Sequence, residues 1–206
     1  MLDRWTAQWV RTPLNKVAVL LVKRITPNQL TFTGFIVGLT AIPLLASQLY
    51  LPALAMIAIN RLMDGLDGAL ARLTTPTDAG GFLDITLDFI FYAGIVLGFA
   101  LANPIKNGVA ANLLLFSFMA TGSSFLAYAI MAEKHKLVDP HFSCKSFYYL
   151  GGIVEGTETI MIFILFCLVP TQFPTLATGF AAVCLLTALM RVIAGFQAIK
   201  YSESRE

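Results

Sequence analysis

Charged residues are scarce in this sequence, and their scarcity excludes the ordinary soluble globular class. Asp, Glu, Lys and Arg make up 13% of the 206 residues, whereas hydrophobic residues make up 57%. In soluble domains roughly a quarter of the residues are charged. A mean hydropathy of +0.76 points the same way. We therefore expect lipid to be the main solvent of this chain.

Cysteine, histidine and net charge are also low. The three cysteines, Cys144, Cys167 and Cys184, form no C-x-x-C pair, and the chain has two histidines. Neither a disulfide framework nor a zinc site is therefore indicated, and we expect the cysteines to be packing residues. The net charge of +2 gives no general attraction for nucleic acid, which is not expected as a partner.

Long apolar segments dominate what is present. A bilayer core about 30 Å thick requires about 20 mostly apolar residues per helical span. The sequence contains six such segments and no internal repeat, so we predict an all-α integral membrane protein that forms a single domain over residues 1–206. The expected spans are Leu30 to Gln48, Pro52 to Arg72, Gly81 to Leu101, Gly108 to Met131, Phe147 to Val169 and Thr175 to Gln197.

The first residues predict an amphipathic helix at the membrane interface. Trp5 and Trp9 lie one helical turn apart, with Arg4 and Arg11 nearby. Indole rings favour the depth of the lipid headgroups, and basic residues favour the water beside them. The alternative is a helix packed on the surface of the protein itself.

Basic residues predict the orientation of the chain in the membrane. They gather before the first span, between the fourth and fifth spans and after the sixth, whereas the turns near Tyr50 and Thr171 contain none and the turn near Pro104 contains only Lys106. Because cytoplasmic loops are rich in Lys and Arg, both termini are expected in the cytoplasm. The end of the second span, marked by Arg72, is expected on the same side.

Four aspartates interrupt the apolar pattern. Asp64 and Asp67 are three residues apart, and Asp84 and Asp88 are four apart, so each pair shares one face of a helix. An ionised Asp near the centre of a span costs about 3 kcal/mol, so four together cost on the order of 10 kcal/mol. Their oxygens form the hard ligand set that Mg²⁺, Mn²⁺ or Ca²⁺ prefers. Two divalent ions would balance the four negative charges.

The residues near the aspartates allow two interpretations. Gly68 and Ala71 leave little bulk on the aspartate face, so that a ligand can approach the helix backbone closely. Arg72 can form forked hydrogen bonds to a phosphate, and together these residues indicate a diphosphate pocket beside metal ions. The alternative is a network of ion pairs in which Arg61, Arg72 and Arg191 neutralise the acids.

The segment "DGLDGALARLTTPTDAGGFLDITLD" resembles the signature of the CDP-alcohol phosphotransferases, D-x2-D-G-x2-A-R-x8-G-x3-D-x3-D. Its fixed positions correspond to Asp64, Asp67, Gly68, Ala71, Arg72, Gly80, Asp84 and Asp88. The chain departs from the pattern in one place, because seven residues instead of eight separate Arg72 from Gly80. A second stretch, "TPNQLT" from Thr26 to Thr31, is similar to the P-N-x-x-T stretch before the family's first span. An ordinary capped helix start is its alternative explanation.

The resemblance implies an enzyme that transfers a phosphate-linked alcohol group from a CDP-alcohol to the hydroxyl of a second alcohol and releases CMP. It implies two ions, Mg²⁺ or Mn²⁺, with Asp64, Asp67 and Asp84 as ligands and Asp88 as the general base and a further ligand. Contacts to the nucleotide and diphosphate are implied for Asn28, Thr31, Gly68, Ala71, Arg72 and Gly80. The resemblance also implies a homodimer. We expect a bacterial inner membrane as its location, and the basic residues of the loops place the active site on the cytoplasmic side.

The sequence predicts the family more narrowly than it predicts the two substrates. CDP-diacylglycerol is the expected donor, because a donor with acyl chains suits a pocket that opens between spans. The alternatives are a CDP-polar alcohol used with a lipid acceptor and, from another class, a small transporter of protons or cations. Glu155 and Glu158, three apart on one face of the fifth span, and Arg191 are the candidate contacts to the acceptor alcohol. Alternatively, Arg191 or Lys145 neutralises the two glutamates.

Overall fold

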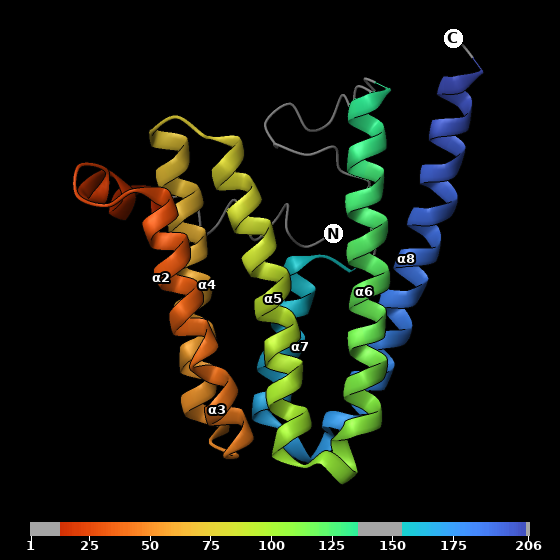
Figure 1. Cartoon of the computed structure of the whole chain (residues 1–206). Helices are drawn as coiled ribbons and strands as arrows, with labels where there is room; N and C mark the ends of the chain where they lie inside the picture. The colour runs from red at the N-terminus through yellow and green to blue at the C-terminus, as the bar shows by residue number, and fades with distance from the viewer. Residues whose placement is uncertain (1–12, 136–153, 205–206) are drawn as a thin grey trace.

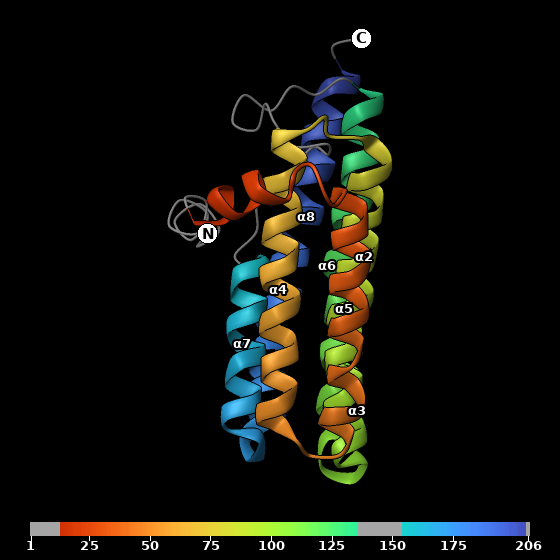
Figure 2. The same ribbon diagram turned by 90° about the vertical axis from the view of Figure 1, so that its left-hand side faces the viewer.

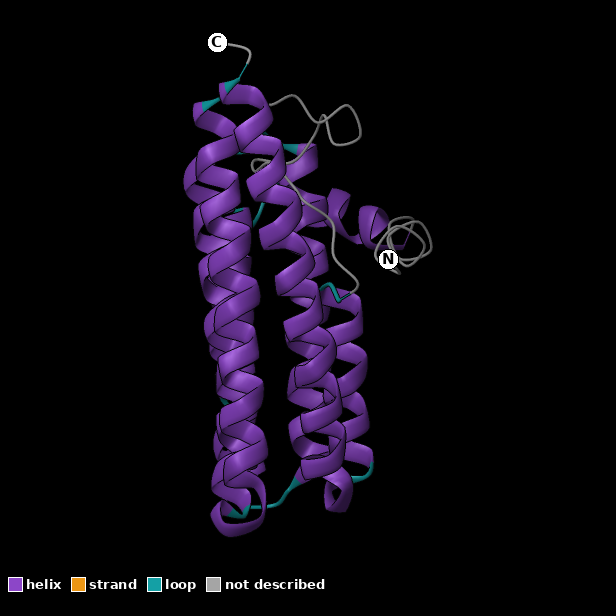
Figure 3. Ribbon diagram, turned by 90° about the vertical axis from the view of Figure 1, so that its right-hand side faces the viewer, coloured by secondary structure: helices purple, strands orange, loops and turns teal. Residues whose placement is uncertain are grey.

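The computed structural model describes residues 13–135 and 154–204, and these residues form a bundle of helices without strands (Figures 1 and 3). A first helix covers residues 13–21. The elements that follow are α2 (Pro27–Leu39), α3 (Ala41–Ala46), α4 (Tyr50–Leu73), α5 (Asp78–Ala102), α6 (Pro104–Lys134), α7 (Gly156–Leu168), the 3₁₀ turn η1 (Pro170–Gln172) and α8 (Phe173–Glu203). The all-α prediction is confirmed.

Within residues 13–135 and 154–204, four helical segments are long and apolar enough to cross a membrane. They are Pro27–Ala46, Asp78–Ala102, Pro104–Lys134 and Pro170–Glu203. The other two expected spans differ from these. Helix α4 has 24 residues but contains two arginines and two aspartates, and α7 has 13 residues within the described part of the chain.

One expected span is wrong in detail, and another contains an interruption. The first expected span agrees with the candidate membrane segment Pro27–Ala46 to within a few residues, but its helix is interrupted at Thr40, between α2 and α3, where the Thr40 hydroxyl donates to the Val37 carbonyl oxygen at 2.6 Å. Pro43 explains the break, because proline has no N–H for the preceding helical turn and its ring crowds that turn. The fifth span was expected from Phe147, but residues 136–153 lie outside the described residues. Val154 and Glu155 are not helical, and α7 begins at Gly156.

Aromatic rings fill the core between α5, α7 and α8. Phe99 stacks on Phe173 with ring centroids 4.7 Å apart, and it meets Phe166 edge-on at 5.5 Å. All three side chains are fully buried. Such close contact matters in lipid, where association of helices depends on van der Waals packing rather than on exclusion of water. Cys167 and Cys184 are buried among the helices without a disulfide, as expected for packing residues.

The three turns that are poor in basic residues lie at one end of the bundle (Figure 1). Polar contacts link them across helices. The Gln48 side-chain amide donates to the Ala102 carbonyl oxygen at 3.0 Å, and the Lys106 ammonium donates to the Thr171 carbonyl oxygen at 3.0 Å. The loop between α4 and α5 lies at the opposite end, so the two pairs of aspartates belong to the basic end of the molecule.

The first helix crosses the bundle instead of running along it (Figure 2). Leu14 and Ala18 of this helix pack against Ala69 and Leu70 of α4. The contact is tight, because a methyl group added at Gly65 would lie 2.8 Å from the Leu14 side chain. Residues 1–12 lie outside the described residues, so the interfacial placement of Trp5 and Trp9 stays a prediction.

The close approach of α3 to α5 depends on Gly98. A methyl group added at Gly98 would lie 2.9 Å from Leu45, whereas one added at Gly179 in α8 would meet nothing within 4 Å. Both glycines are helical, so alanine raises helix propensity equally at both positions. We predict that Gly98→Ala destabilises the protein by about 1 to 3 kcal/mol and that Gly179→Ala does not. Melting midpoints of the two purified variants measure this, and equal midpoints would show that the glycine contact has no role in packing.

Candidate active site

The four aspartates converge where α4 ends and α5 begins. These antiparallel helices are joined by the short loop Thr74 to Thr77, so their neighbouring turns face each other. Carboxylate oxygens of Asp64, Asp84 and Asp88 lie within 4.8 Å of one another. The sequence spacing had placed each pair on one face, and the structure brings the two faces together.

A small hollow lies between these carboxylates. Its volume is about 10 Å³, close to that of one water-sized sphere, and all four aspartates line it. Asp67 is 6% exposed, and its buried Oδ2 atom has no hydrogen-bond partner within the described part of the chain. A buried carboxylate oxygen without a donor is unfavourable. The oxygen donors and the unpaired Asp67 Oδ2 therefore fit a divalent cation.

Arg61 joins this cluster from α4 and was missed as a site residue. Its Nη2 atom lies 2.7 Å from Asp88 Oδ1, and its Nη1 atom lies 3.5 Å from Asp64 Oδ2. The ion-pair alternative is therefore correct for Arg61, although Arg61 does not balance the charge of four acids. The signal was present in the sequence, because Arg61 precedes Asp64 by three residues and must share its helix face.

A larger pocket of about 330 Å³ adjoins the hollow at the same end of the bundle. Thr31, Asp67 and Asp84 line both spaces, so the pocket is continuous with the aspartates. Its size is in the range of small-molecule sites. The pocket is lined by Thr26, Pro27, Asn28, Thr31, Asp67, Gly68, Ala71, Thr74, Thr75, Pro76, Thr77, Gly80, Gly81 and Asp84. These include all the residues expected to contact the nucleotide except Arg72.

The Pro-Asn stretch at the start of α2 has two explanations, a contact to the nucleotide and an ordinary helix cap. Thr26 caps α2, because its hydroxyl accepts the Gln29 N–H at 3.3 Å while the Gln29 side chain accepts the Thr26 N–H at 3.1 Å. The cap therefore does not use Asn28, which is exposed and lines the pocket. A methyl group added at Gly80 would lie 3.0 Å from Asn28 Oδ1, so glycine lets α5 approach α2 closely here.

Arg72 lies beside the pocket and does not line it. The residue is exposed in the last turn of α4, and its Nη1 atom would lie 3.5 Å from a methyl group added at Gly68. The guanidinium group therefore lies over Gly68, at the rim of the pocket. This position differs from that of Arg61, which is largely buried among the acids.

The three residues expected at the acceptor do not line the aspartate hollow or the adjoining pocket. The sequence predicted that Glu155 and Glu158 share one face of a helix, and this is wrong. Glu155 is the N-cap of α7, and its N–H donates to the Glu158 carboxylate at 3.1 Å. Arg191 is 7% exposed, and it donates to the Thr121 carbonyl oxygen at 3.0 Å. The Val154 N–H donates to the Thr187 hydroxyl, one turn before Arg191, so the start of α7 adjoins this part of α8.

Comparison with known proteins gives a consistent fold. The crystal structure of Mycobacterium tuberculosis phosphatidylinositol phosphate synthase with CDP-DAG bound matches with a TM-score of 0.65 and 19% sequence identity, covering 89% of this chain and 93% of that one. The inner membrane protein YnjF of Escherichia coli (strain K12) is 52% identical over 201 residues, which are 97% of this chain and 98% of its own length.

A less similar relative has a name that states an enzymatic activity. The archaetidylinositol phosphate synthase of Pyrococcus horikoshii is 34% identical over 140 residues, covering 63% of this chain and 74% of its own length. The family model described as CDP-alcohol phosphatidyltransferase matches residues 24–202. This match contains the aspartates, the pocket and all six elements from α2 to α7 as well as most of α8. The chain therefore belongs to the CDP-alcohol phosphatidyltransferase family.

Proposed function

We propose that this protein transfers the phosphatidyl group of CDP-diacylglycerol to the hydroxyl of a polar acceptor and releases CMP. The observation that carries the proposal is the continuity between a carboxylate hollow and a pocket of about 330 Å³, which share Thr31, Asp67 and Asp84. The solved structure with the same fold contains CDP-DAG, which supports this donor. Leu73 and Phe82 are exposed apolar side chains near the pocket residues, and they suit a donor with acyl chains.

The pocket residues suggest how the nucleotide is held. Asn28 offers hydrogen bonds to the base or ribose, and Thr31 lies between the pocket and the aspartates. Gly68, Ala71 and Gly80 keep the wall free of bulk, so that the diphosphate can approach the backbone. At the rim, Arg72 is placed to form forked hydrogen bonds with a phosphate group.

The aspartates are assigned to charge and proton chemistry. Asp64, Asp67, Asp84 and Asp88 would hold divalent ions, Mg²⁺ or Mn²⁺, and the chemistry these supply when bound is neutralisation of charge on the diphosphate oxygens. Asp88 accepts the proton of the acceptor hydroxyl as that oxygen forms its bond to the phosphatidyl phosphorus. The bond between this phosphorus and CMP then breaks, and CMP leaves with the electron pair.

For the acceptor, we propose a phosphorylated polyol such as inositol phosphate. The names of the Pyrococcus horikoshii and Mycobacterium tuberculosis proteins support this class. Arg191, almost buried and always charged, suits a phosphate group, while Glu155 and Glu158 suit sugar hydroxyls.

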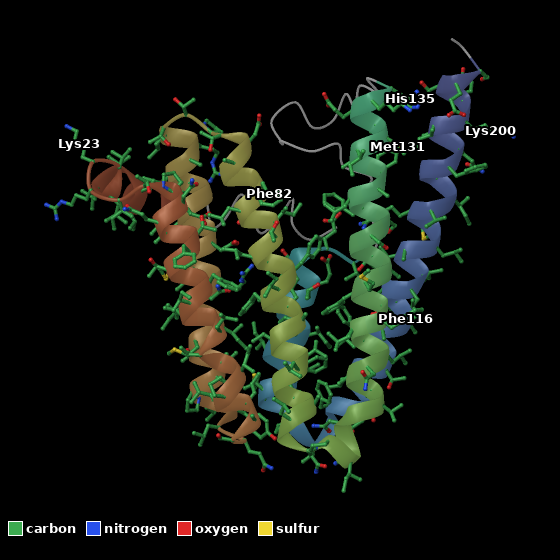
Figure 4. All side chains as sticks on the ribbon, viewed as in Figure 1. Lys23, Phe82, Phe116, Met131, His135 and Lys200 are labelled. Atoms are coloured by element: carbon green, nitrogen blue, oxygen red, sulfur yellow. The ribbon has the colours of Figure 1, made fainter. Side chains whose placement is uncertain are left out.

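The arrangement in the membrane belongs to the same proposal. It comprises six spans, an interfacial N-terminal helix, a single domain over residues 1–206, a homodimer and a cytoplasmic active site in a bacterial inner membrane. The relative named as an inner membrane protein supports the location. Lys23, His135 and Lys200 lie toward the same end of the bundle as the loop between α4 and α5, which supports the orientation (Figure 4).

CMP release tests the reaction directly. Purified protein with CDP-diacylglycerol should release CMP when Mg²⁺ or Mn²⁺ and inositol phosphate are both present, and EDTA should abolish release. Inositol, serine and glycerol 3-phosphate serve as acceptor controls, because inositol lacks the phosphate, glycerol 3-phosphate lacks the ring and serine lacks both. Full activity in EDTA would refute the metal assignment, and faster transfer to another acceptor would refute only the choice of polyol.

Two aspartate variants separate a base from a ligand. Asp88→Asn should slow turnover by about 10² to 10⁴ because it removes the proton acceptor, while donor affinity with Mg²⁺ changes little. Asp67→Asn should reduce donor affinity and turnover together, since it removes a carboxylate from both the hollow and the pocket. Donor affinity is measured by equilibrium binding of labelled CDP-diacylglycerol in detergent micelles. Equal losses of affinity in the two variants would make Asp88 a ligand and not the base.

Cysteine labelling tests the orientation. In a cysteine-free background, Lys23→Cys and Thr171→Cys introduce thiols at opposite ends of the bundle. A membrane-impermeant thiol reagent applied to intact cells should label the second variant and miss the first. Both should react after the cells are lysed, which controls for accessibility. The reverse pattern in intact cells would place the aspartates on the outer side of the membrane.

A further inference from the structure

Arg61 is held among the aspartates by contacts in several directions. Besides its ion pairs with Asp88 at 2.7 Å and Asp64 at 3.5 Å, its Nε atom donates to Asn60 Oδ1 at 2.8 Å. Its Nη1 atom lies 3.4 Å from the Tyr92 hydroxyl. The Arg61 side chain is 15% exposed, so these contacts are shielded from water.

Aromatic rings and helix α2 also hold the guanidinium group of Arg61 in place. The Arg61 Cζ atom lies 4.7 Å from the centroid of the Phe91 ring and 5.5 Å from that of the Tyr92 ring. Asn60, which accepts from Arg61, donates its own amide to the Gly34 carbonyl oxygen in α2 at 2.9 Å. The guanidinium group is therefore tied to three helices, and each of its three nitrogen atoms contacts a polar group of the protein. Arg61 also differs from Arg72 in burial, because Arg72 is exposed at the rim of the pocket.

The charge of Arg61 differs from that of a bound ion in one respect. Four ionised aspartates with Arg61 have a formal charge of −3 (−4 + 1), and repulsion between carboxylates is strong where water is scarce. A divalent ion can dissociate, whereas Arg61 is part of the chain and keeps its charge throughout. Its contacts join one carboxylate from each pair, Asp64 of α4 and Asp88 of α5.

We propose that Arg61 is a positioning residue, which holds Asp88 and Asp64 in their places by its own charge whether or not a divalent ion is bound. The inference rests on the proposed function in taking these aspartates as ion-binding groups. Arg61 then supplies part of the positive charge that the cluster requires, and an ion supplies the rest.

Thermal unfolding with and without Mg²⁺ tests the proposal. In EDTA, Arg61→Met should lower the melting midpoint by about 5 °C or more, because breaking a buried ion pair leaves uncompensated charge. Saturating Mg²⁺ should restore most of this loss, since the ion replaces the missing charge and stabilises the state that it binds. Arg61→Lys, which keeps the charge, should show a smaller loss in EDTA. Arg24→Met removes an exposed arginine and should change neither midpoint.

The unfolding data distinguish a charge from a packing role. If the wild-type midpoint rises with Mg²⁺ but Arg61→Met loses the same number of degrees in EDTA and in Mg²⁺, the arginine acts only by packing on Phe91 and Tyr92, and the proposal is wrong. It is also wrong if Arg61→Met in saturating Mg²⁺ has a normal midpoint but loses affinity for CDP-diacylglycerol, because Arg61 would then contact the substrate.

A double-mutant cycle separates this inference from the metal assignment. In EDTA, Asp88→Asn should cost much less stability in the Arg61→Met background than in the wild type, because their shared ion pair is already broken. Additive losses would overturn the role of Arg61. A wild-type protein whose midpoint does not rise with Mg²⁺ would count against the metal proposal alone, since the cycle in EDTA requires no ion.

Discussion

Repulsion between four carboxylates in a largely apolar bundle is the constraint on which the rest of this structure depends. The hairpin of α4 and α5 brings Asp64, Asp84 and Asp88 within 4.8 Å, and such a cluster stays ionised only if positive charge compensates it. Arg61 supplies one unit from within the chain. The buried Asp67 Oδ2 atom, without a partner among the described residues, marks where further compensation is needed. The proposed binding of divalent ions and the contacts of Arg61 therefore have the same physical origin.

The two ends of the bundle differ in how their helices pack. Away from the aspartates, Phe99, Phe166 and Phe173 fill the space between helices, and Gly98 lets α3 lie close to α5. Near the aspartates, the helices leave a pocket of about 330 Å³, and the contacts there are polar. The crosswise helix packs its Ala18 against Ala69 and Leu70 of α4 and supports that helix beside the acids. A well-packed half thus holds an open and highly charged half in one geometry.

Local spacing explains which features could be predicted from the sequence. The pairing of the aspartates on two helix faces follows from separations of three and four residues, and the structure agrees. The partner of Asp88 could not be predicted in this way, because the contact of Arg61 across to α5 depends on how two helices pack. The start of α7 was also missed. Glu158 accepts the backbone N–H of Glu155 at a helix terminus, and the apolar pattern around them gave no sign of that terminus.

The distribution of acids along the chain also bears on the transporter alternative. Apart from the aspartate region, long stretches contain no Asp or Glu at all, including residues 4–63, 89–132 and 159–202. Buried polar groups in the other half are uncharged and bond to nearby backbone, as Asn107 does to the Phe99 carbonyl oxygen and Ser117 does to that of Leu114. A route for ions requires ionisable groups through the depth of the membrane. Within the described residues, the aspartates instead gather beside a pocket at one end, an arrangement suited to binding a charged substrate there.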